Sequence, residues 1–543
     1  MSQENPDWWR GGAIYQIYPR SFSDSRQRGW GDLNGIRRRL PYLASLGVDV
    51  VWVCPFFKSP MEDFGYDVED HRRVDPMFGT DEEFDLLIAE AQSMNIKIMV
   101  DLVLSHVAKS HRWFQDASKN PDSEYSDCFV WADAKPDGSP PNNWLSIFGG
   151  SAWAWNSVRC QYYLHNFLVS QPDLNFHDPR VRAEALSIAR FWLERGVSGF
   201  RLDTVNFYFH DRELRDNPAT DHRDEALTKD SNPYGFQDHI YDKNRPEVLS
   251  FLSELGALMR EYPGTVTLGE IGSIRKRSWS LIRDYTDGDR LSLCYTFDLL
   301  GGTFSAPYIR DTLRRSLREA PNAWPCWAYA NHDVERSATR LAPDGVAPDT
   351  IARLSNSLLL SLRGTPCIYQ GEELGLEEVS VPFEQLQDPY GVEFWPDYVG
   401  RDGCRTPMPW EHAKPGCGFT SDAEPWLPIP EAHRQRAVSV QEEDPDSPLN
   451  HFRRVVAMRR REPALQIGDM SVLDGSDQLL SYVRSHEGVS VCCYFNLSGE
   501  SVSLTHLGLE AAVIFDGRLD DWRQEAGPLT IEPWSWVWVR SAQ

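Results

Sequence analysis

Residues 199–203 read Gly-Phe-Arg-Leu-Asp, an apolar run that carries one arginine and ends on a carboxylate. Amphipathic segments with helical periodicity, such as Asp81–Met94 and Arg180–Arg195, separate most of the similar runs along the chain. Eight strands that alternate with helices predict a parallel (β/α)8 barrel, or TIM barrel, of the α/β class. The other seven predicted strands are Ala13–Tyr18, Val50–Val53, Ile96–Leu102, Thr265–Glu270, Leu293–Phe297, Trp327–Asn331 and Pro366–Tyr369.

Three stretches that follow these strands are too long for a single helix. Residues 105–176, after the third strand, are rich in Trp, Asn, Asp, Gly and Pro and predict a small inserted domain. Residues 206–246 carry many charges and predict a lid, and residues 371–447 follow the eighth strand. All three leave the carboxyl ends of strands, where the active face of such a barrel lies, so we expect them to shape a functional site.

The helical pattern stops near Gln466, and two later runs, Val489–Phe495 and Trp534–Val539, have the composition of strands. This pattern predicts a C-terminal antiparallel β-sandwich domain. The chain of 543 residues then divides into four parts. They are the first part of the barrel (1–104), the inserted B domain (105–176), the second part of the barrel (177–463) and the C-terminal domain (464–543).

Composition excludes several classes of partner. A net charge of −25 without a basic face argues against nucleic acid, and no apolar run approaches the length of a membrane helix. The first residues are polar, unlike a signal peptide, and the ten cysteines show no metal spacing, so we expect a cytoplasmic protein with free thiols. Twenty tryptophans and twenty tyrosines favour carbohydrate, because aromatic rings stack on sugar faces.

Polar side chains cluster where the predicted strands end. Asp101 lies near the end of the third strand, Asp203 and Glu270 end the fourth and fifth, and Asp333 follows the seventh. Barrel geometry brings such residues around one mouth. Glycoside cleavage needs a carboxylate that attacks the sugar and a carboxylic acid, with a raised pKa, that protonates the leaving oxygen. An arginine beside the attacking carboxylate, such as Arg201, keeps it ionised.

Four motifs carry a resemblance to a known family. In chain order they are Asp101-Leu-Val-Leu-Ser-His106, Gly199-Phe-Arg-Leu-Asp203, Leu268-Gly-Glu270 and Asn331-His-Asp333. They resemble the conserved regions of glycoside hydrolase family 13, the α-amylase superfamily, and the resemblance covers nearly the whole chain. It implies a retaining reaction in which Asp203 is the nucleophile, Glu270 the general acid and base, and Asp333 the transition-state stabiliser.

Finer features resemble the branch of α-glucosidases and oligo-1,6-glucosidases. Gln171-Pro-Asp-Leu-Asn175, Tyr163-Leu-His-Asn-Phe167, Gly65-Tyr66-Asp67 and the segment Gly400–Trp410 match that branch. In it, the counterparts of Asp67 and Arg405 hold the terminal 4-hydroxyl, and Tyr66 stacks on the sugar ring. The substrate-binding residues implied by the resemblance are Tyr66, Asp67, His106, Phe167, Arg201, Thr204, His332 and Arg405.

Two places depart from the family pattern. Many relatives bind a calcium-like ion in the loop after the first strand, but here Arg26 and Arg28 replace two oxygen ligands. We expect these arginines to pair with Asp24 and Asp32, and we expect no bound metal and no cofactor. Ser105 stands before His106, where relatives usually have asparagine.

The resemblance implies an exo-acting retaining α-glucosidase that removes terminal glucose from small α-glucosides and also transfers glucose to hydroxyl acceptors. Thr204 favours maltose-like α-1,4 donors, because relatives selective for α-1,6 links tend to have valine there. The acceptor could be water, an alcohol, a phenol or a sugar, and lid aromatics would favour an alcohol or phenol unless they only pack the lid. These aromatics are Phe207, Tyr208, Phe209, Tyr234 and Phe236.

Two other activities on this fold stay open, a dedicated α-glucosyltransferase and an enzyme that isomerises sucrose or maltose. A non-enzymatic transporter subunit with a similar barrel is disfavoured, because the chain keeps all three carboxylates and has no membrane helix. We expect no nucleic-acid or membrane partner, and a monomer or homodimer.

Overall fold

Eight short parallel strands form the centre of the computed structural model, which describes residues 7–221, 228, 230–504 and 511–541. Hydrogen bonds connect the strands in the order β11-β10-β9-β5-β2-β1-β13-β12, and β12 also contacts β11, which closes the barrel. The predicted TIM barrel is therefore confirmed. Its strands are β1 (Ile14–Ile17), β2 (Val50–Val53), β5 (Lys97–Leu102), β9 (Gly199–Leu202), β10 (Val266–Ile271), β11 (Leu293–Thr296), β12 (Cys326–Trp327) and β13 (Thr365–Tyr369).

Each predicted strand overlaps an observed one, but the seventh is shorter than expected. Pairing in β12 covers Cys326–Trp327, whereas the apolar run continues to Asn331. Most strand residues are buried on both faces, as expected for a parallel sheet enclosed by helices.

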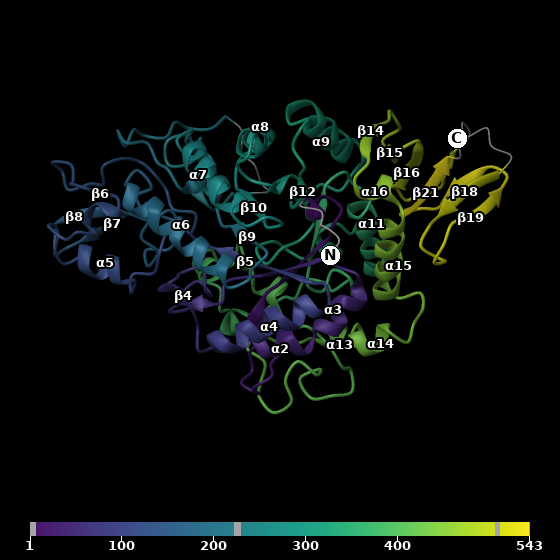
Figure 1. Ribbon diagram of the computed structural model, residues 1–543, viewed down its shortest axis with the longest axis horizontal. Coiled ribbons are helices and arrows are strands. Elements are labelled where there is room, and N and C mark those ends of the chain that lie inside the picture. Colours follow the sequence, from purple (N-terminus) through teal and green to yellow (C-terminus); the bar gives the residue numbers. More distant parts are fainter. Residues whose placement is uncertain (1–6, 222–227, 229, 505–510, 542–543) are drawn as a thin grey trace.

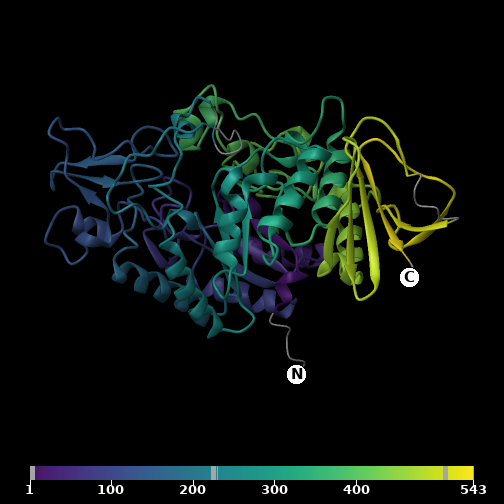
Figure 2. The ribbon, with the colours of Figure 1, turned by 90° about the horizontal axis from the view of Figure 1, so that it is seen from above.

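Amphipathic helices surround the strands (Figures 1 and 2). In α4 (Asp81–Ser93), Phe84, Leu87, Ile88 and Ala91 are buried at the spacing of one helix face. A capping box between Thr80 and Glu83 begins this helix. Other covering helices are α2 (Leu33–Arg38), α3 (Leu40–Leu46), α6 (Pro179–Glu194), α7 (Val248–Arg260), α8 (Arg275–Thr286), α9 (Ala306–Glu319), α11 (Pro348–Leu359) and α15 (Pro448–Arg461).

The segment after β5 forms a small lobe of its own, at the left of Figures 1 and 2. It contains α5 (Arg112–Ala117) and an antiparallel sheet of β6 (Trp131–Ala132), β8 (Gln161–Leu164) and β7 (Trp153–Asn156). Trp144 and Trp153 stack 5.9 Å apart in its apolar core. These elements fall within residues 105–176, the range expected for the inserted domain.

The C-terminal part is an antiparallel sheet that follows α15 and the short helix α16 (Pro463–Gln466). Its strand order is β14-β15-β16-β21-β18-β19, and β17 and β20 form a second, two-stranded sheet. An apolar cluster that includes Leu479, Leu504 and Ile531 joins the two sheets. The expected boundary at 463/464 falls inside α16. The strands are β14 (Asp469–Val472), β15 (Leu479–His486), β16 (Val489–Asn496), β17 (Val502–Leu504), β18 (Ala511–Phe515), β19 (Arg523–Ala526), β20 (Leu529–Ile531) and β21 (Ser535–Ser541).

Among the residues that the structure describes, no helix is long and apolar enough to cross a membrane.

Candidate active site

Neighbouring strands bring the predicted carboxylates to one end of the barrel. Asp101 lies near the end of β5, opposite Arg201 of β9, and Glu270 of β10 lies opposite Tyr295 of β11. Asp203 follows β9 directly, so these side chains converge although the chain separates them widely.

Arg201 is the centre of the first charged cluster. Its Nη1 atom lies 2.6 Å from Asp203 Oδ1 and 2.9 Å from Asp101 Oδ1, and its Nη2 atom lies 2.6 Å from Glu270 Oε2. Tyr295 donates a hydrogen bond of 2.8 Å to Glu270 Oε1. We call Arg201 with Asp101, Asp203 and Glu270 the Arg201 group. It places three carboxylates on one fully buried guanidinium.

Burial and mutual repulsion alter the acidity of this group. Burial raises the pKa of Glu270 to about 7, with Asp203 and Asp333 adding to the shift and Arg201 opposing it. Burial also raises the pKa of Asp203 to about 7, again against the attraction of Arg201. Because the two carboxyl groups share Arg201, they titrate as a pair. Near neutral pH the pair can hold one proton, which a nucleophile and an acid require.

Arg401 is the centre of a second cluster. Its guanidinium lies 3.0 Å from Asp63 Oδ1, 3.0 Å from Asp333 Oδ1 and 2.7 Å from Asp388 Oδ1. We call Arg401 with Asp63, Asp333 and Asp388 the Arg401 group. Arg405 adds a second cation, 3.0 Å from Asp333 Oδ1, and donates to the carbonyl oxygen of His332 at 2.7 Å.

The pKa of Asp333 is shifted in the opposite direction from that of Glu270. Burial works to raise its pKa, but the neighbouring His332 ring and the Arg401 and Arg405 guanidiniums outweigh burial and hold that pKa well below its usual range. Its side chain is 27% exposed, more than that of Asp203 at 7% or Glu270 at 5%. Asp333 thus presents a permanent negative charge to the open side of the site.

Aromatic and histidine rings line the space between the two groups. Tyr66 stacks on His332, with ring centroids 5.1 Å apart, and donates to Asp101 Oδ2 at 3.1 Å. Phe167 packs 4.9 Å from the His106 ring. Burial lowers the pKa of His106 to about 4 and that of His332 to about 3, so both rings are neutral near pH 7. The structure thus gathers Tyr66, His106, Phe167 and His332 beside the three carboxylates.

Asp67, by contrast, does not face this space. Its side chain is fully buried and accepts hydrogen bonds from Ser59 Oγ at 2.8 Å and from the backbone amides of Glu62 at 2.8 Å and Asp63 at 3.1 Å. These bonds commit both carboxylate oxygens to the turn at residues 59–63, so the geometry gives no support to the expectation that Asp67 holds a substrate hydroxyl. Asp63, three residues before Tyr66, and Arg401, four before Arg405, are the residues that the sequence analysis missed.

The motif Gln171–Asn175 forms hydrogen bonds that position residues of the site. Gln171 Nε2 donates to Asp63 Oδ2 at 3.0 Å, and its Oε1 atom accepts from the backbone amide of Leu168 at 2.9 Å. Asp173 accepts from the backbone amide of Asn166 at 3.2 Å and also from its side chain. The motif therefore fixes both Asp63 and the segment that carries Phe167.

Thr204 connects the nucleophile candidate with the acid candidate. Its backbone amide donates to Glu270 Oε2 at 3.1 Å, and its hydroxyl donates to Asp203 Oδ2 at 3.1 Å. Ser105 Oγ lies 3.2 Å from that hydroxyl. Both residues thus contact the reacting groups or their direct neighbours.

The loop after β1 folds differently from our expectation. Asp24 accepts from the backbone amides of Arg26, Arg28 and Gly29, and Asp32 accepts from Ser25 and the amide of Gly35. The Arg26 guanidinium pairs instead with Glu83. The predicted pairing of Arg26 and Arg28 with these two aspartates is wrong, because backbone amides already bind both carboxylates. Across the described residues, no three His, Cys, Asp or Glu side chains are grouped to hold a metal.

The predicted lid aromatics are mostly structural. Phe207, Tyr208, Phe209 and Tyr234 are buried, while Phe236 is 40% exposed. Residues 222–227 and 229 of the lid lie outside the described residues. Phe207 packs 5.3 Å from Phe167 and so reaches the site through that ring.

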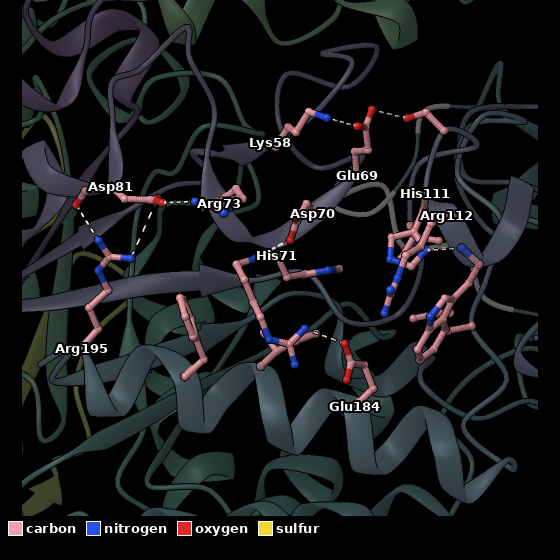
Figure 3. A pocket seen from close by; sticks show the side chains of 17 residues that line it. Lys58, Glu69, Asp70, His71, Arg73, Asp81, His111, Arg112, Glu184 and Arg195 are labelled. Atoms are coloured by element: carbon pink, nitrogen blue, oxygen red, sulfur yellow. Dashed lines mark hydrogen bonds and ion pairs between the residues drawn. The ribbon is translucent and has the colours of Figure 1, made fainter.

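One hollow lies away from these carboxylates, between β4 (Asp70–Val74), α6 and the start of the inserted domain (Figure 3). It has a volume of about 680 Å³. Charged side chains line it, but most are paired with one another, as in Lys58–Glu69, Arg72–Glu184 and Arg73–Asp81. None of the three catalytic candidates borders it, so we place the active site at the barrel mouth.

Comparison with known proteins agrees with this geometry. The family model for the catalytic domain of α-amylase matches residues 16–468. A probable α-glucosidase of Rhizobium meliloti (strain 1021) is 54% identical over 508 residues, covering 93% of this chain and 92% of the relative. An oligo-1,6-glucosidase of Heyndrickxia coagulans is 32% identical and covers 95% of each chain.

Solved structures also superpose over nearly the whole chain. The α-glucosyl transfer enzyme XgtA is 48% identical, with a TM-score of 0.94 and coverage of 98% of this chain and 99% of that one. Trehalulose synthase MutB from Pseudomonas mesoacidophila MX-45 is 30% identical, with a TM-score of 0.87 and the same coverage. The four motifs, the barrel and these matches together show that the chain is a glycoside-active enzyme of the α-amylase family, glycoside hydrolase family 13, among the α-glucosidases and their glucosyl-transferring relatives.

Proposed function

We propose that this enzyme removes terminal glucose from small α-glucosides by a retaining mechanism, through a covalent glucosyl ester on Asp203. The observation that carries the proposal is Arg201, which lies 2.6 Å from both Asp203 and Glu270. One guanidinium on both carboxylates keeps them close together, as a retaining pair requires. Domain ranges, a cytoplasmic location and a monomeric or dimeric state stay predictions.

The proposed reaction has two steps. Asp203 attacks the anomeric carbon while Glu270 gives its proton to the leaving oxygen, and the pKa of Glu270, raised to about 7, suits that role. A hydroxyl acceptor then attacks the glucosyl ester, and Glu270 takes the acceptor's proton. Asp333, held ionised by two guanidiniums, would stabilise the positive charge that develops on the sugar.

The Arg401 group supports cleavage from the chain end. Arg401 links Asp63 to Asp333 and lies over the Phe148 ring at 5.3 Å, so it forms a charged wall against the inserted lobe. We assign to Asp63 and Arg401 the grip on the terminal sugar hydroxyl that the sequence analysis gave to Asp67 and Arg405. Arg405 would act through Asp333, with which it pairs.

The proposed donor preference rests on Thr204. Its hydroxyl lies 3.1 Å from Asp203 Oδ2, at a position where relatives selective for α-1,6 links tend to have valine. We therefore keep maltose-like α-1,4 donors as the preferred class.

Transfer to a hydroxyl acceptor other than water is the second candidate activity. The 48% identity to an α-glucosyl transfer enzyme over nearly the whole chain favours it. Because most of the lid aromatics are buried, they offer an alcohol or phenol little direct contact. The similarity to trehalulose synthase keeps isomerisation of sucrose as a further outcome to test.

The test is incubation with maltose, isomaltose and sucrose, each with and without an alcohol or phenol acceptor, followed by identification of the products. We expect glucose and glucosylated acceptor from maltose, with retention of the α-configuration by NMR. Asp203→Asn should lower turnover at least about 10⁴-fold, since it removes the nucleophile. Near-normal turnover of this variant, or an inverted product, would contradict the proposed function.

A further inference from the structure

Thr204 has a backbone conformation that β-branched residues rarely adopt. Its φ of 38° and ψ of 49° lie in the left-handed region. Such strain persists only where the surroundings fix it, and it concentrates at functional sites. Here the conformation directs the amide of Thr204 to Glu270 Oε2 and its hydroxyl to Asp203 Oδ2, each at 3.1 Å. One residue thus touches both reacting carboxylates.

The hydrogen-bond partners of His106 determine the direction of a short chain of hydroxyls. His106 Nε2 lies 2.9 Å from the carbonyl oxygen of Tyr66, which can only accept. Its other neighbour, Gln171 Nε2, is more distant at 3.3 Å and already donates to Asp63 at 3.0 Å, so the shorter contact with Tyr66 assigns the ring proton to Nε2. The ring is neutral near pH 7 because burial lowers the pKa of His106 to about 4, so Nδ1 is an acceptor. Ser105 Oγ, 2.9 Å from Nδ1, therefore donates to it.

With its proton committed to His106, Ser105 Oγ can only accept from its other neighbour. That neighbour is the Thr204 hydroxyl, 3.2 Å away. The single proton of Thr204 consequently has two possible acceptors, Asp203 Oδ2 at 3.1 Å and Ser105 Oγ. Ser105 is buried at 2% exposure, so bulk water does not compete freely for this position.

The two oxygens of Asp203 are held unequally. Arg201 binds Oδ1 at 2.6 Å through a charge-assisted hydrogen bond, whereas the hydroxyl of Thr204 binds Oδ2 at 3.1 Å. Oδ2 is the oxygen that can leave its partner more easily. When Oδ2 bonds to the anomeric carbon, the bond to the glycosidic oxygen breaks, its electron pair stays on that oxygen, and the proton of Glu270 neutralises it. Oδ2 becomes an ester oxygen, a poor acceptor, so the Thr204 hydroxyl needs another one.

We propose that Ser105 and Thr204 form a two-position hydroxyl pair that assists glucosylation: Thr204 donates to Asp203 Oδ2 in the resting enzyme and to Ser105 Oγ once the glucosyl ester has formed. Both are positioning residues, and the inference rests on the function proposed above. Ser105, which departs from the family pattern, supplies the second acceptor. Without it, the Thr204 hydroxyl would lose its partner as the ester forms.

A double-mutant cycle tests this pair. The readout is kcat/KM for 4-nitrophenyl α-glucoside, which reports the steps up to release of nitrophenol. Ser105→Ala should lower kcat/KM about tenfold through kcat, with KM little changed. In a Thr204→Val background the same change should cost less than about twofold, because no hydroxyl then needs an acceptor. Thr204→Ser keeps the hydroxyl and should restore the roughly tenfold effect of Ser105→Ala.

Two results would overturn the inference: equal losses from Ser105→Ala in the unmodified enzyme and in the Thr204→Val background, or no loss in the unmodified enzyme. Thermal unfolding of each variant identifies misfolding, and Thr204→Ala replaces Thr204→Val if that variant does not fold. The proposed function fails separately, if the unmodified enzyme releases no nitrophenol or if Asp203→Asn still does. When both of those tests succeed and the cycle is additive, the hydroxyl pair alone is wrong.

Discussion

The Arg201 group and the Arg401 group have the same number of carboxylates but opposite chemistry. In the Arg201 group, three buried carboxylates share one guanidinium, and burial raises the pKa of Glu270 and of Asp203 to about 7. In the Arg401 group, the His332 ring and two guanidiniums, Arg401 and Arg405, hold the pKa of Asp333 well below its usual range. The neighbouring groups, more than burial alone, separate the carboxylates that exchange protons from one that stays charged.

This difference in acidity suggests different roles for the two groups toward the sugar. The Arg201 group, at the ends of β5, β9 and β10, holds the residues that we propose form and break bonds. The Arg401 group joins the barrel to the loop at 388–405 and to Asp63 through ion pairs, so it can bind hydroxyls and stabilise charge without titrating. Asp63 is its one member whose pKa is raised, because burial outweighs Arg401 there.

The largest expected effect tests the proton that the Arg201 group holds. Glu270→Gln removes the acid but keeps its shape, so turnover of maltose should fall about 10³-fold. With 4-nitrophenyl α-glucoside the loss of kcat/KM should stay below about tenfold, since nitrophenolate leaves without a proton. Steady-state kinetics on both substrates measure the ratio.

Glu372→Gln is the matched control, because burial also raises the pKa of Glu372 to about 7, but Glu372 binds Ser337 and the amide of Tyr369 rather than Arg201. It should leave the ratio of the two substrates unchanged. Equal losses of both substrates in Glu270→Gln would exclude Glu270 as the acid.

A smaller effect should separate Asp63 from Asp67. Asp63→Asn weakens one ion pair of Arg401, so kcat/KM for maltose should fall about 10- to 100-fold. Asp333 and Asp388 still pair with Arg401 in this variant, so the protein should stay folded. Asp67→Asn removes a carboxylate that accepts two backbone amides, so unfolding should become easier by about 1–3 kcal/mol.

We expect kcat/KM of folded Asp67→Asn to stay within about threefold of the unmodified enzyme. Kinetics together with thermal unfolding distinguish the two variants. If Asp67→Asn lost activity without losing stability, the assignment of the terminal hydroxyl would return to Asp67.

Asp63 and Asp67 also show which parts of the site could be predicted from the sequence. The barrel was predictable because its strands are apolar runs of similar length, and the three carboxylates were predictable because each follows such a run. The choice between Asp63 and Asp67 was not, because Arg401 meets Asp63 across 338 residues of chain and motif spacing gives no side-chain direction. The predicted pairing of arginines with aspartates in the loop at 24–32 was wrong for a related reason. Backbone amides bind these aspartates, and because every sequence carries such amides, residue types alone do not reveal the contact.

The smallest expected effect is the pH dependence, and it compares the two groups within one measurement. The active form has Asp203 ionised and Glu270 protonated, so kcat/KM should follow a bell with both limbs set by the Arg201 group. Raising the pH through about 7 removes the proton of Glu270, so the rate should fall on the alkaline side and approach a loss of about tenfold for each further pH unit. Asp333 adds no limb to this pH profile, because its pKa lies far below this range.

In Glu270→Gln, assayed with 4-nitrophenyl α-glucoside, the alkaline limb should vanish while the acid limb of Asp203 stays. An alkaline limb that survives in this variant would assign the second titration to another group, and the contrast between the two clusters would then rest on geometry alone.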